Sequence, residues 1–291
     1  MDLAARVPRM PQPGETLAGH GFLANPGGKG ANQAVACARQ GARVEMVGRV
    51  GEDGFAGELR NALHAQEIEH ARVVGTPGFR TGVAMILVDD RAQNCIAVIP
   101  GANAAVDEAD AEALRLPLQD AAMLLLQLEV PMPAVLRAAT LARQAGCTVL
   151  LNPAPAQDLP EALWPLVDIL VLNETEAQCL TGLPCATPAG AGEAARRVHR
   201  RGPRDVLLTL GEQGVLWCSA EGLQHVQALR VQAVDTTAAG DTFIGALAAL
   251  LVEGAGMVEA VRHASRAAAL CVTRQGAQAS MPSRPEVDAM R

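Results

Sequence analysis

The sequence predicts an α/β protein built around a mostly parallel β-sheet. Four apolar runs have the length and composition of buried strands: Ala122–Leu128, Thr148–Leu151, Ile169–Leu172 and Val206–Leu210. Helical patterns, among them 133–144 and 189–201, lie between the runs. Continuous apolar strands separated by helices are typical of a parallel sheet that is covered on both faces.

A polar group follows each of the four runs. These groups are Gln127-Leu-Glu129, Asn152-Pro-Ala-Pro155, Asn173-Glu-Thr-Glu176 and Thr209-Leu-Gly211. The carboxyl ends of parallel strands meet at one edge of a sheet, where open α/β folds bind their ligands. One polar residue at a strand end is commonplace, but four in succession predict a binding site.

The N-terminal part has a different pattern. Segments 14–25 and 81–100 alternate or are bounded by turns, with no helix inside either one. We expect a small β-layer here that projects from the α/β body as a lid over the strand ends. The stretch Ala186–Ala195, rich in alanine and glycine, is expected to be a loose surface loop.

The amino-acid composition argues against several classes of protein function. The chain has 291 residues, 49% hydrophobic and 2% aromatic, with no tyrosine and a net charge of −7, so a basic or base-stacking face for nucleic acid is not expected. No apolar stretch approaches the ~18 residues of a membrane span. Seven cysteines form no CxxC pair, and the start lacks an apolar signal segment, which favours the cytoplasm and disfavours zinc or disulfide chemistry.

The segment Val234–Leu247 places polar residues at the start of an otherwise apolar helix. At Ala239-Gly240-Asp241 the first backbone N–H groups of the helix lack intrahelical partners at its positive dipole end, which makes an anion site. Asp241 would lie beside that anion. A carboxylate next to a phosphate site suggests phosphoryl transfer to a hydroxyl group.

A glycine-rich turn, Asn25–Gln33, precedes a helix predicted over 31–39. It is not a P-loop, because Lys29 is followed by glycine, and no GxGxxG motif occurs. The turn could be only a flexible helix cap, or its glycines could admit a polyol whose hydroxyls bind Lys29 and Asn32. Similarly, 173–176 could be a plain helix start, Asn152-Pro a turn, and 209–214 a hairpin connection.

The motifs GGKGANQA, NPAP, NETE, TLGEQG and DTTAAGDTF occur in this order. In order and spacing, the chain resembles the ribokinase-like (PfkB) carbohydrate kinases over nearly its whole length, and most closely the members that phosphorylate ribose. The resemblance implies a three-layer α/β sandwich with a mostly parallel central sheet and a small β-sheet lid. It places the core at 26–74 and 102–291 and the lid, which would also form a homodimer interface, at 3–25 and 75–101.

The resemblance also implies an ATP-dependent sugar kinase that uses Mg²⁺ and K⁺. Asp241 would be the catalytic base, with Ala239 and Gly240 as the anion hole. Sugar-binding positions would be Asp2, Gly28, Lys29, Asn32, Glu129 and Asp241. Nucleotide contacts would be Asn173, Thr209, Gly211, Gly214 and Gly240, with Glu176 for Mg²⁺. Positions for K⁺ would be Asp235, Thr237, Arg274, Gly276 and Ser280.

The implied substrate is D-ribose, phosphorylated at O5. Alternatives are another small sugar, such as deoxyribose or fructose, or a catalytically impaired sugar-binding relative. Two departures from the family pattern stand out. Ser265 replaces the His or Asn that relatives place beside the adenine. The family opens with a strand ending in Asn-x-Asp, whereas this sequence begins at Met1-Asp2, so a core strand before residue 1 is expected to be missing.

Overall fold

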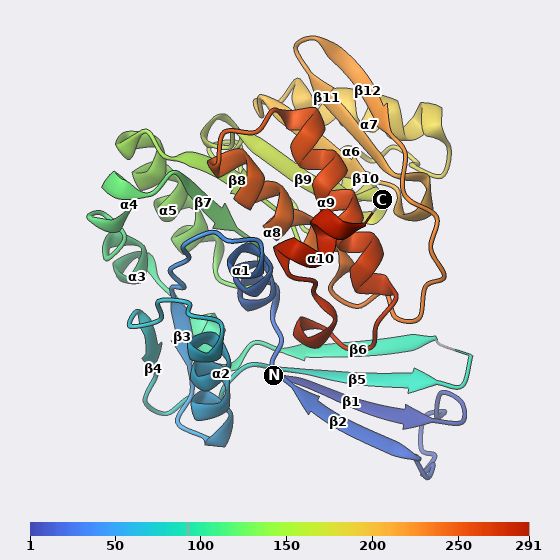
Figure 1. Ribbon diagram of the computed structural model, residues 1–291. Coiled ribbons are helices and arrows are strands. Elements are labelled where there is room, and N and C mark those ends of the chain that lie inside the picture. Colours follow the sequence, from blue (N-terminus) through green and yellow to red (C-terminus); the bar gives the residue numbers. More distant parts are fainter. Residues whose placement is uncertain (92, 291) are drawn as a thin grey trace.

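The computed structural model describes residues 1–91 and 93–290 and has a six-stranded central sheet (Figure 1). The strand order is β12-β11-β10-β9-β8-β7. Four strands are parallel: β7 (Met123–Leu126), β8 (Thr148–Leu151), β9 (Ile169–Asn173) and β10 (Asp205–Thr209). The antiparallel strands β11 (Val215–Ser219) and β12 (Gly222–Val226) extend the sheet at one edge. The predicted fold class is confirmed.

The central strands are apolar on both faces because helices cover both faces. Leu150 belongs to one hydrophobic core and Leu151 to the other, as alternation along a strand requires. One core is closed by α3 (Glu108–Glu112), α4 (Pro117–Asp120), α5 (Met132–Ala145), α6 (Glu174–Thr181) and α7 (Pro188–His199). The other is closed by α1 (Lys29–Arg39), α8 (Ala239–Val252), α9 (Met257–Val272) and α10 (Arg284–Ala289). The result is three layers (Figure 1). Of the helices described, none has the length and apolarity to cross a membrane.

The loose loop expected at 186–195 is wrong, because most of this segment is the first part of α7. Thr187 caps the helix by accepting a hydrogen bond from the Gly190 N–H, at 3.2 Å. Ala191, Ala194 and Ala195 are fully buried, since α7 packs against β10 and β11. The small residues thus reflect close packing on the sheet and not loop flexibility.

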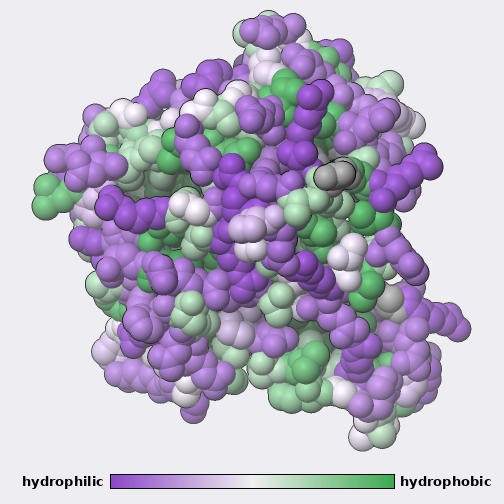
Figure 2. All heavy atoms as spheres, in the orientation of Figure 1, coloured by the Kyte–Doolittle hydropathy of each residue, from purple (hydrophilic) through white to green (hydrophobic). Residues whose placement is uncertain are grey.

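A four-stranded lid sheet lies beside the core, in the order β2-β1-β5-β6 (Figure 1). Its strands are β1 (Asp2–Val7), β2 (Gly21–Asn25), β5 (Val83–Asp89) and β6 (Asn94–Ile99). The predicted β-sheet lid is confirmed. Two details differ: residues 14–20 lie outside the strands, and Asp2–Val7 (β1) was not predicted to be a strand. Every residue of β6 is exposed. Figure 2 shows apolar side chains at the surface over the lid, in the lower part of the view.

A short parallel pair, β3 (Gly48–Val50) and β4 (Val73–Gly75), forms a separate sheet to one side of the lid, with α2 (Gly54–Ala65) connecting its strands (Figure 1). This pair packs against α1 in a third, smaller hydrophobic cluster. The chain passes from this pair into β5 of the lid through residues 76–82.

Helices α1 and α8 pack closely at Gly245. A Cβ atom at this position would lie 2.3 Å from the Ala36 Cβ and 2.7 Å from the Cys37 backbone nitrogen. Only glycine fits without moving one helix away from the other.

We expect Gly245→Val to lower the free energy of unfolding by about 1–3 kcal/mol, because the added atoms overpack the contact between α1 and α8. The matched control is Gly57→Val in α2, where a Cβ has no neighbour within 4 Å. Urea denaturation monitored by circular dichroism measures both. Equal stability of the two variants would mean that α1 and α8 do not pack as closely as described.

Candidate functional site

Asp241 lies in the first turn of α8 and is 7% exposed. Its two carboxylate oxygens accept hydrogen bonds from two side chains of α1. The Gln33 Nε2 donates to Oδ1 at 3.0 Å, and the Asn32 Nδ2 donates to Oδ2 at 3.1 Å. The close packing of α1 on α8 therefore holds this carboxylate in one orientation.

A network of amides extends from Gln33 to the sheet. The Gln33 Nε2 also donates to Asn152 Oδ1 at 3.2 Å, and the Gln127 Nε2 donates to Gln33 Oε1. Asn152 in turn donates to the Val171 carbonyl at 3.0 Å. Two of the polar groups predicted at strand ends thus meet at one place and orient Gln33. Sequence reasoning assigned no role to Gln33, and its complete burial becomes apparent only in the structure.

Three carboxylates, of Asp2, Glu129 and Asp241, lie within each other's electrostatic field. For each of them burial raises the pKa above its usual range. The charge of Asp241 further raises the pKa of Asp2 and of Glu129, and the charge of Asp2 further raises that of Glu129. The charge of Lys29 acts in the opposite direction on all three. The predicted sugar-binding residues are therefore grouped around one lysine at the base of the lid.

The glycine-rich turn brings backbone as well as side chains to this group. The Lys29 N–H donates to Glu129 Oε2 at 2.8 Å. Gly28 has φ of 92°, a value that favours glycine, and precedes α1 as its N-cap. A Cβ on Gly27 would lie 2.1 Å from the Asp2 Oδ2. Gly27 is thus required by the close approach to Asp2 and Gly28 by the turn, and the segment is a helix cap, as the simpler interpretation held.

The start of α8 presents free backbone donors. In the described part of the chain, the N–H groups of Gly240 and Asp241 have no hydrogen-bond acceptor. Ala238 has φ of 59° and turns the chain into the helix. Gly240 is exposed, and a Cβ there would have no neighbour within 4 Å. Open space above unpaired N–H groups at a helix N-terminus suits an anion.

The predicted nucleotide positions lie on two adjacent strand ends. Thr209 of β10 pairs directly with Asn173 of β9. Gly211 and Gly214 have φ of 54° and 94° in the connection to β11, and a Cβ on Gly214 would lie 2.1 Å from the Val226 carbonyl oxygen. The 209–214 segment is thus also the hairpin connection considered above. Ser265, in the middle of α9, donates its hydroxyl to the Val261 carbonyl at 2.8 Å, and no contact joins it to this group.

Glu176 is a buried carboxylate at the start of α6. Its oxygens accept hydrogen bonds from the backbone and side-chain nitrogens of Asn173, at 2.8 and 3.0 Å, while Asn173 caps the helix. The segment is therefore a helix start, as the simpler interpretation held. Burial raises the pKa of Glu176, and the charge of Lys29 is among the lowering influences. Among the described residues Glu176 has no ion-pair partner.

Two loops meet beside the start of α8. Asp235 accepts hydrogen bonds from the N–H groups of Thr237 and Gly276, both at 2.9 Å. Burial would raise the pKa of Asp235, but hydrogen bonds from Thr237 and Gly276 hold it below its usual range. The Arg274 guanidinium pairs with Glu286, and the buried Ser280 hydroxyl bonds the Ala277 carbonyl at 2.7 Å.

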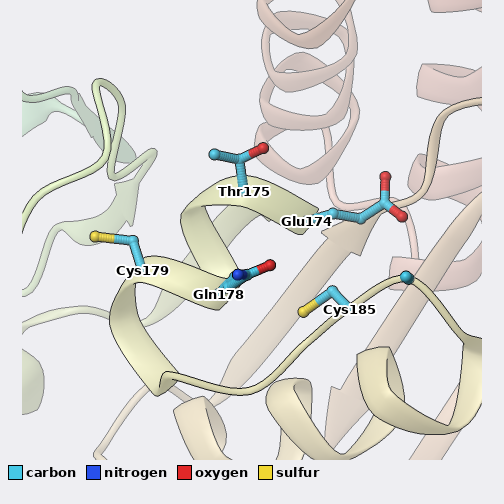
Figure 3. A pocket seen from close by; sticks show the side chains of 6 residues that line it. Glu174, Thr175, Gln178, Cys179 and Cys185 are labelled. Carbon is cyan, nitrogen blue, oxygen red and sulfur yellow. The ribbon is translucent and has the colours of Figure 1, made fainter.

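A separate surface depression borders α6 (Figure 3). Its lining residues are Glu174, Thr175, Gln178, Cys179, Cys185 and Ala186. None of them is a predicted site residue, and Asp241 is not among them. This depression is therefore separate from the group of predicted site residues around Lys29.

A parallel sheet with an anion site at its edge and carboxylates beneath a lid defines a class of small-molecule phosphotransferases. The model of the pfkB family carbohydrate kinases matches residues 1–284. The chain belongs to this family and is a carbohydrate kinase that transfers a phosphoryl group to an alcohol.

Several characterised relatives are similar over nearly their full length. The ribokinase of Haemophilus influenzae is 40% identical over 285 residues, covering 98% of this chain and 93% of the relative. The deoxyribokinase of Salmonella typhi is 39% identical over 284 residues, with 97% and 93% covered. Among solved structures, Arabidopsis thaliana ribokinase complexed with ribose and ATP matches with a TM-score of 0.90 at 34% identity, with 98% and 94% covered.

Proposed function

We propose that this protein is an ATP-dependent ribokinase that phosphorylates D-ribose at O5. The observation that carries the proposal is the position of Asp241, a buried carboxylate held by Asn32 and Gln33 at the free N-terminus of α8. The similarity to ribokinases, and to one solved with ribose and ATP, supports the choice of sugar.

In the proposed reaction, Asp241 accepts the proton of the attacking hydroxyl and orients it toward the γ-phosphoryl group. The N–H groups of Gly240 and Asp241 bind the phosphoryl oxygens, with Ala239 in the same turn. Phosphoryl transfer passes through a loose, anionic transition state, so positioning and charge stabilisation contribute most of the catalysis. Asp2, Lys29, Asn32 and Glu129 would hold the other sugar hydroxyls, with Gly28 giving the sugar access to the backbone.

The nucleotide would lie along Asn173, Thr209, Gly211 and Gly214 and reach α9 near Ser265. Glu176 suits Mg²⁺, because it is a buried carboxylate without an ion-pair partner in the described ranges and each oxygen keeps a free lone pair. When bound, Mg²⁺ would neutralise phosphate charge. Through a coordinated water, Glu176 would set its position.

For K⁺, the loops joined by Asp235 and Gly276 offer carboxylate and carbonyl oxygens next to the phosphoryl site. Thr237 and Ser280 complete the proposed set. Arg274 could contribute only its backbone carbonyl, since a guanidinium is itself a cation with no acceptor atom, and it pairs with Glu286.

We expect K⁺ to raise the rate above that in Na⁺, because the cation would order these loops beside the start of α8. The measurement is initial rate at equal ionic strength in K⁺, Na⁺ and tetramethylammonium. Equal rates in all three would remove the cation from the proposal.

The lid offers a surface for a second copy of the chain, and we propose a homodimer formed through it. Six large apolar side chains on its strands are at least 45% exposed: Phe22, Leu23, Met85, Ile96, Val98 and Ile99. An exposed apolar sheet of this kind marks an association surface. Sedimentation of the protein at micromolar concentration tests the proposed homodimer, and a monomer at that concentration would contradict it.

A second candidate function, deoxyribokinase, is favoured by the 39% identity to the Salmonella typhi enzyme. The discriminating experiment is a coupled ADP-release assay with ribose, deoxyribose and fructose, beside calorimetric titration with each sugar. We expect the highest kcat/KM for ribose. A higher value for deoxyribose would transfer the assignment to that sugar, and binding without turnover would indicate an impaired relative.

A further inference from the structure

The two connections between the β5–β6 hairpin of the lid and the core meet at one place. We call this place the lid root and define it as Gly51–Asp53, Arg80–Gly82 and Pro100–Ala102. The chain enters β5 through Thr81-Gly82 and leaves β6 through Pro100-Gly101. The Ala102 N–H donates to the Arg80 carbonyl at 2.8 Å, which joins the two connections. Any change at the lid root is transmitted to the whole β5–β6 hairpin.

Asp53 joins two segments of the lid root, because both of its carboxylate oxygens bind Thr81. It accepts hydrogen bonds from the Thr81 N–H at 2.7 Å and from the Thr81 hydroxyl at 2.6 Å. It also caps α2 by accepting from the Ala56 N–H at 3.2 Å. The Thr81 hydroxyl in turn accepts from the Gly51 N–H at 3.0 Å. A single carboxylate thus ties the lid to the start of a core helix.

Three glycines make the lid root too crowded for other residues. A Cβ on Gly51 would lie 2.3 Å from the Thr81 backbone nitrogen. A Cβ on Gly82 would lie 2.5 Å from the Pro100 carbonyl oxygen, and one on Gly101 would lie 2.4 Å from the Arg80 carbonyl oxygen. Backbone packed this closely has few alternative arrangements, so hydrogen bonds to Asp53 fix the direction in which the lid leaves the core.

The lid root lies directly before β5, the strand that pairs with Asp2 of β1. Ala84, three residues after Thr81, pairs with Asp2, and its N–H donates to the Met1 carbonyl at 2.8 Å. Asp2 is therefore held between β5 on one side and Asn25 of β2 on the other, and β5 leaves the core at the lid root.

We propose that Asp53 and Thr81 are positioning residues for sugar binding, which clamp the lid root so that Asp2 is held beside Asp241. The proposal rests on the proposed function, in which Asp2 binds the sugar. Neither residue touches the sugar site. Hydrogen bonds to a charged group are among the stronger ones in proteins, so the clamp is a suitable place to set lid position.

The test is Thr81→Val, which keeps the shape of the side chain and removes its hydroxyl. The matched control is Thr76→Val in the same connection, because Thr76 is 5% exposed and its buried hydroxyl has no partner in the described residues. We expect Thr81→Val to raise the KM for ribose about tenfold, the size of one lost hydrogen bond to a charged group, with kcat and the KM for ATP changed less than about threefold. Thr76→Val should match the wild type, and Thr81→Ser should restore the ribose KM.

A second readout does not depend on activity. We expect amide hydrogen exchange in β1 and β5 of the sugar-free protein to become faster in Thr81→Val and to stay unchanged in Thr76→Val. If the wild type does not use ribose, the proposed function fails, and exchange still tests the clamp. A purely structural role would lower the folded fraction and the apparent kcat instead of raising KM.

Asp53→Asn tests the carboxylate itself, with Asp107→Asn as its control. Asp107 caps α3 by accepting from the Ala109 N–H at 2.9 Å and does not contact the lid. We expect only Asp53→Asn to raise the ribose KM and speed exchange in β1 and β5. Unchanged KM and exchange in both Thr81→Val and Asp53→Asn would overturn the proposal, as would equal effects in the two controls.

Discussion

Replacing Asp241 with alanine should lower kcat by about 10²–10⁴-fold, the loss expected for a general base, while the fold is retained. The physical reason is that no other carboxylate occupies this place at the start of α8, where Asn32 and Gln33 hold it. Steady-state kinetics with saturating sugar and ATP measures the loss.

The matched control is Asp205→Ala. Asp205 is also buried and hydrogen-bonded, to the Trp217 Nε1 at 2.8 Å, but it begins β10 at the end of the strand opposite Thr209. The Asp205→Ala variant should be less stable than the wild type but should keep the same kcat per folded molecule. Retention of most activity in Asp241→Ala would remove this carboxylate from the mechanism.

The pH profile gives an independent check on Asp241. Burial raises its pKa above the ordinary 3.8, and the charge of Lys29 lowers it. A base acts only when deprotonated, so kcat/KM should fall as the pH is lowered through this raised pKa. Lys29→Met should move the acid limb to higher pH, because the lowering influence is lost. An acid limb that does not move would contradict this electrostatic account.

Replacing Gly240 with valine should lower kcat by about 10²–10³-fold, as the loss of one oxyanion donor does. The protein itself has room for the side chain, since a Cβ at Gly240 meets nothing within 4 Å. Any loss of activity would therefore come from crowding of the phosphoryl group and not from disturbed packing.

Gly256→Val is the control for this variant. Gly256 is the N-cap of α9, and a Cβ there also has no neighbour within 4 Å. Thermal midpoints of both variants should stay close to the wild type, while only Gly240→Val loses activity. If Gly240→Val were fully active, the phosphoryl group would have to bind elsewhere.

The central sheet could be predicted from sequence because strands buried on both faces leave a strong signal. The run Thr148–Leu151 is β8 with the same bounds, and Ile169–Leu172 is β9 without its last residue. Strand β1 was missed because Asp2–Val7 shows no regular alternation of apolar and polar residues, and its partners β2 and β5 lie about 20 and 80 residues further on. Helix α7 was partly taken for a loop because alanine and glycine are equally suited to a flexible loop and to a closely packed helix.

The sequence predicted those residues of the candidate site whose polarity is unusual at their position in a strand or helix. Polar groups at strand ends and the start of α8 stood out against apolar surroundings. Gln33 and the pair Asp53–Thr81 did not, since a lone glutamine in a helix and an aspartate at a helix start are ordinary. Their roles appear only when their partners, which are distant in sequence, are brought next to them.

The pairing of α1 with α8 also determines when the site can exist. Asn32 and Asp241 are 209 residues apart, and Gln33 and Asp241 are 208 apart. During synthesis from the N-terminus, the glycine turn and α1 emerge long before the helix that carries the carboxylate. Until α8 is made, α1 lacks the partner that buries Ala36 and Cys37, and the amides of Asn32 and Gln33 have no anion to bind. Closing so long a loop is slow and comes late in folding. If Asp241 acts as proposed, sugar phosphorylation reports that α8 has docked onto α1, and nascent fragments ending before α8 lack this carboxylate.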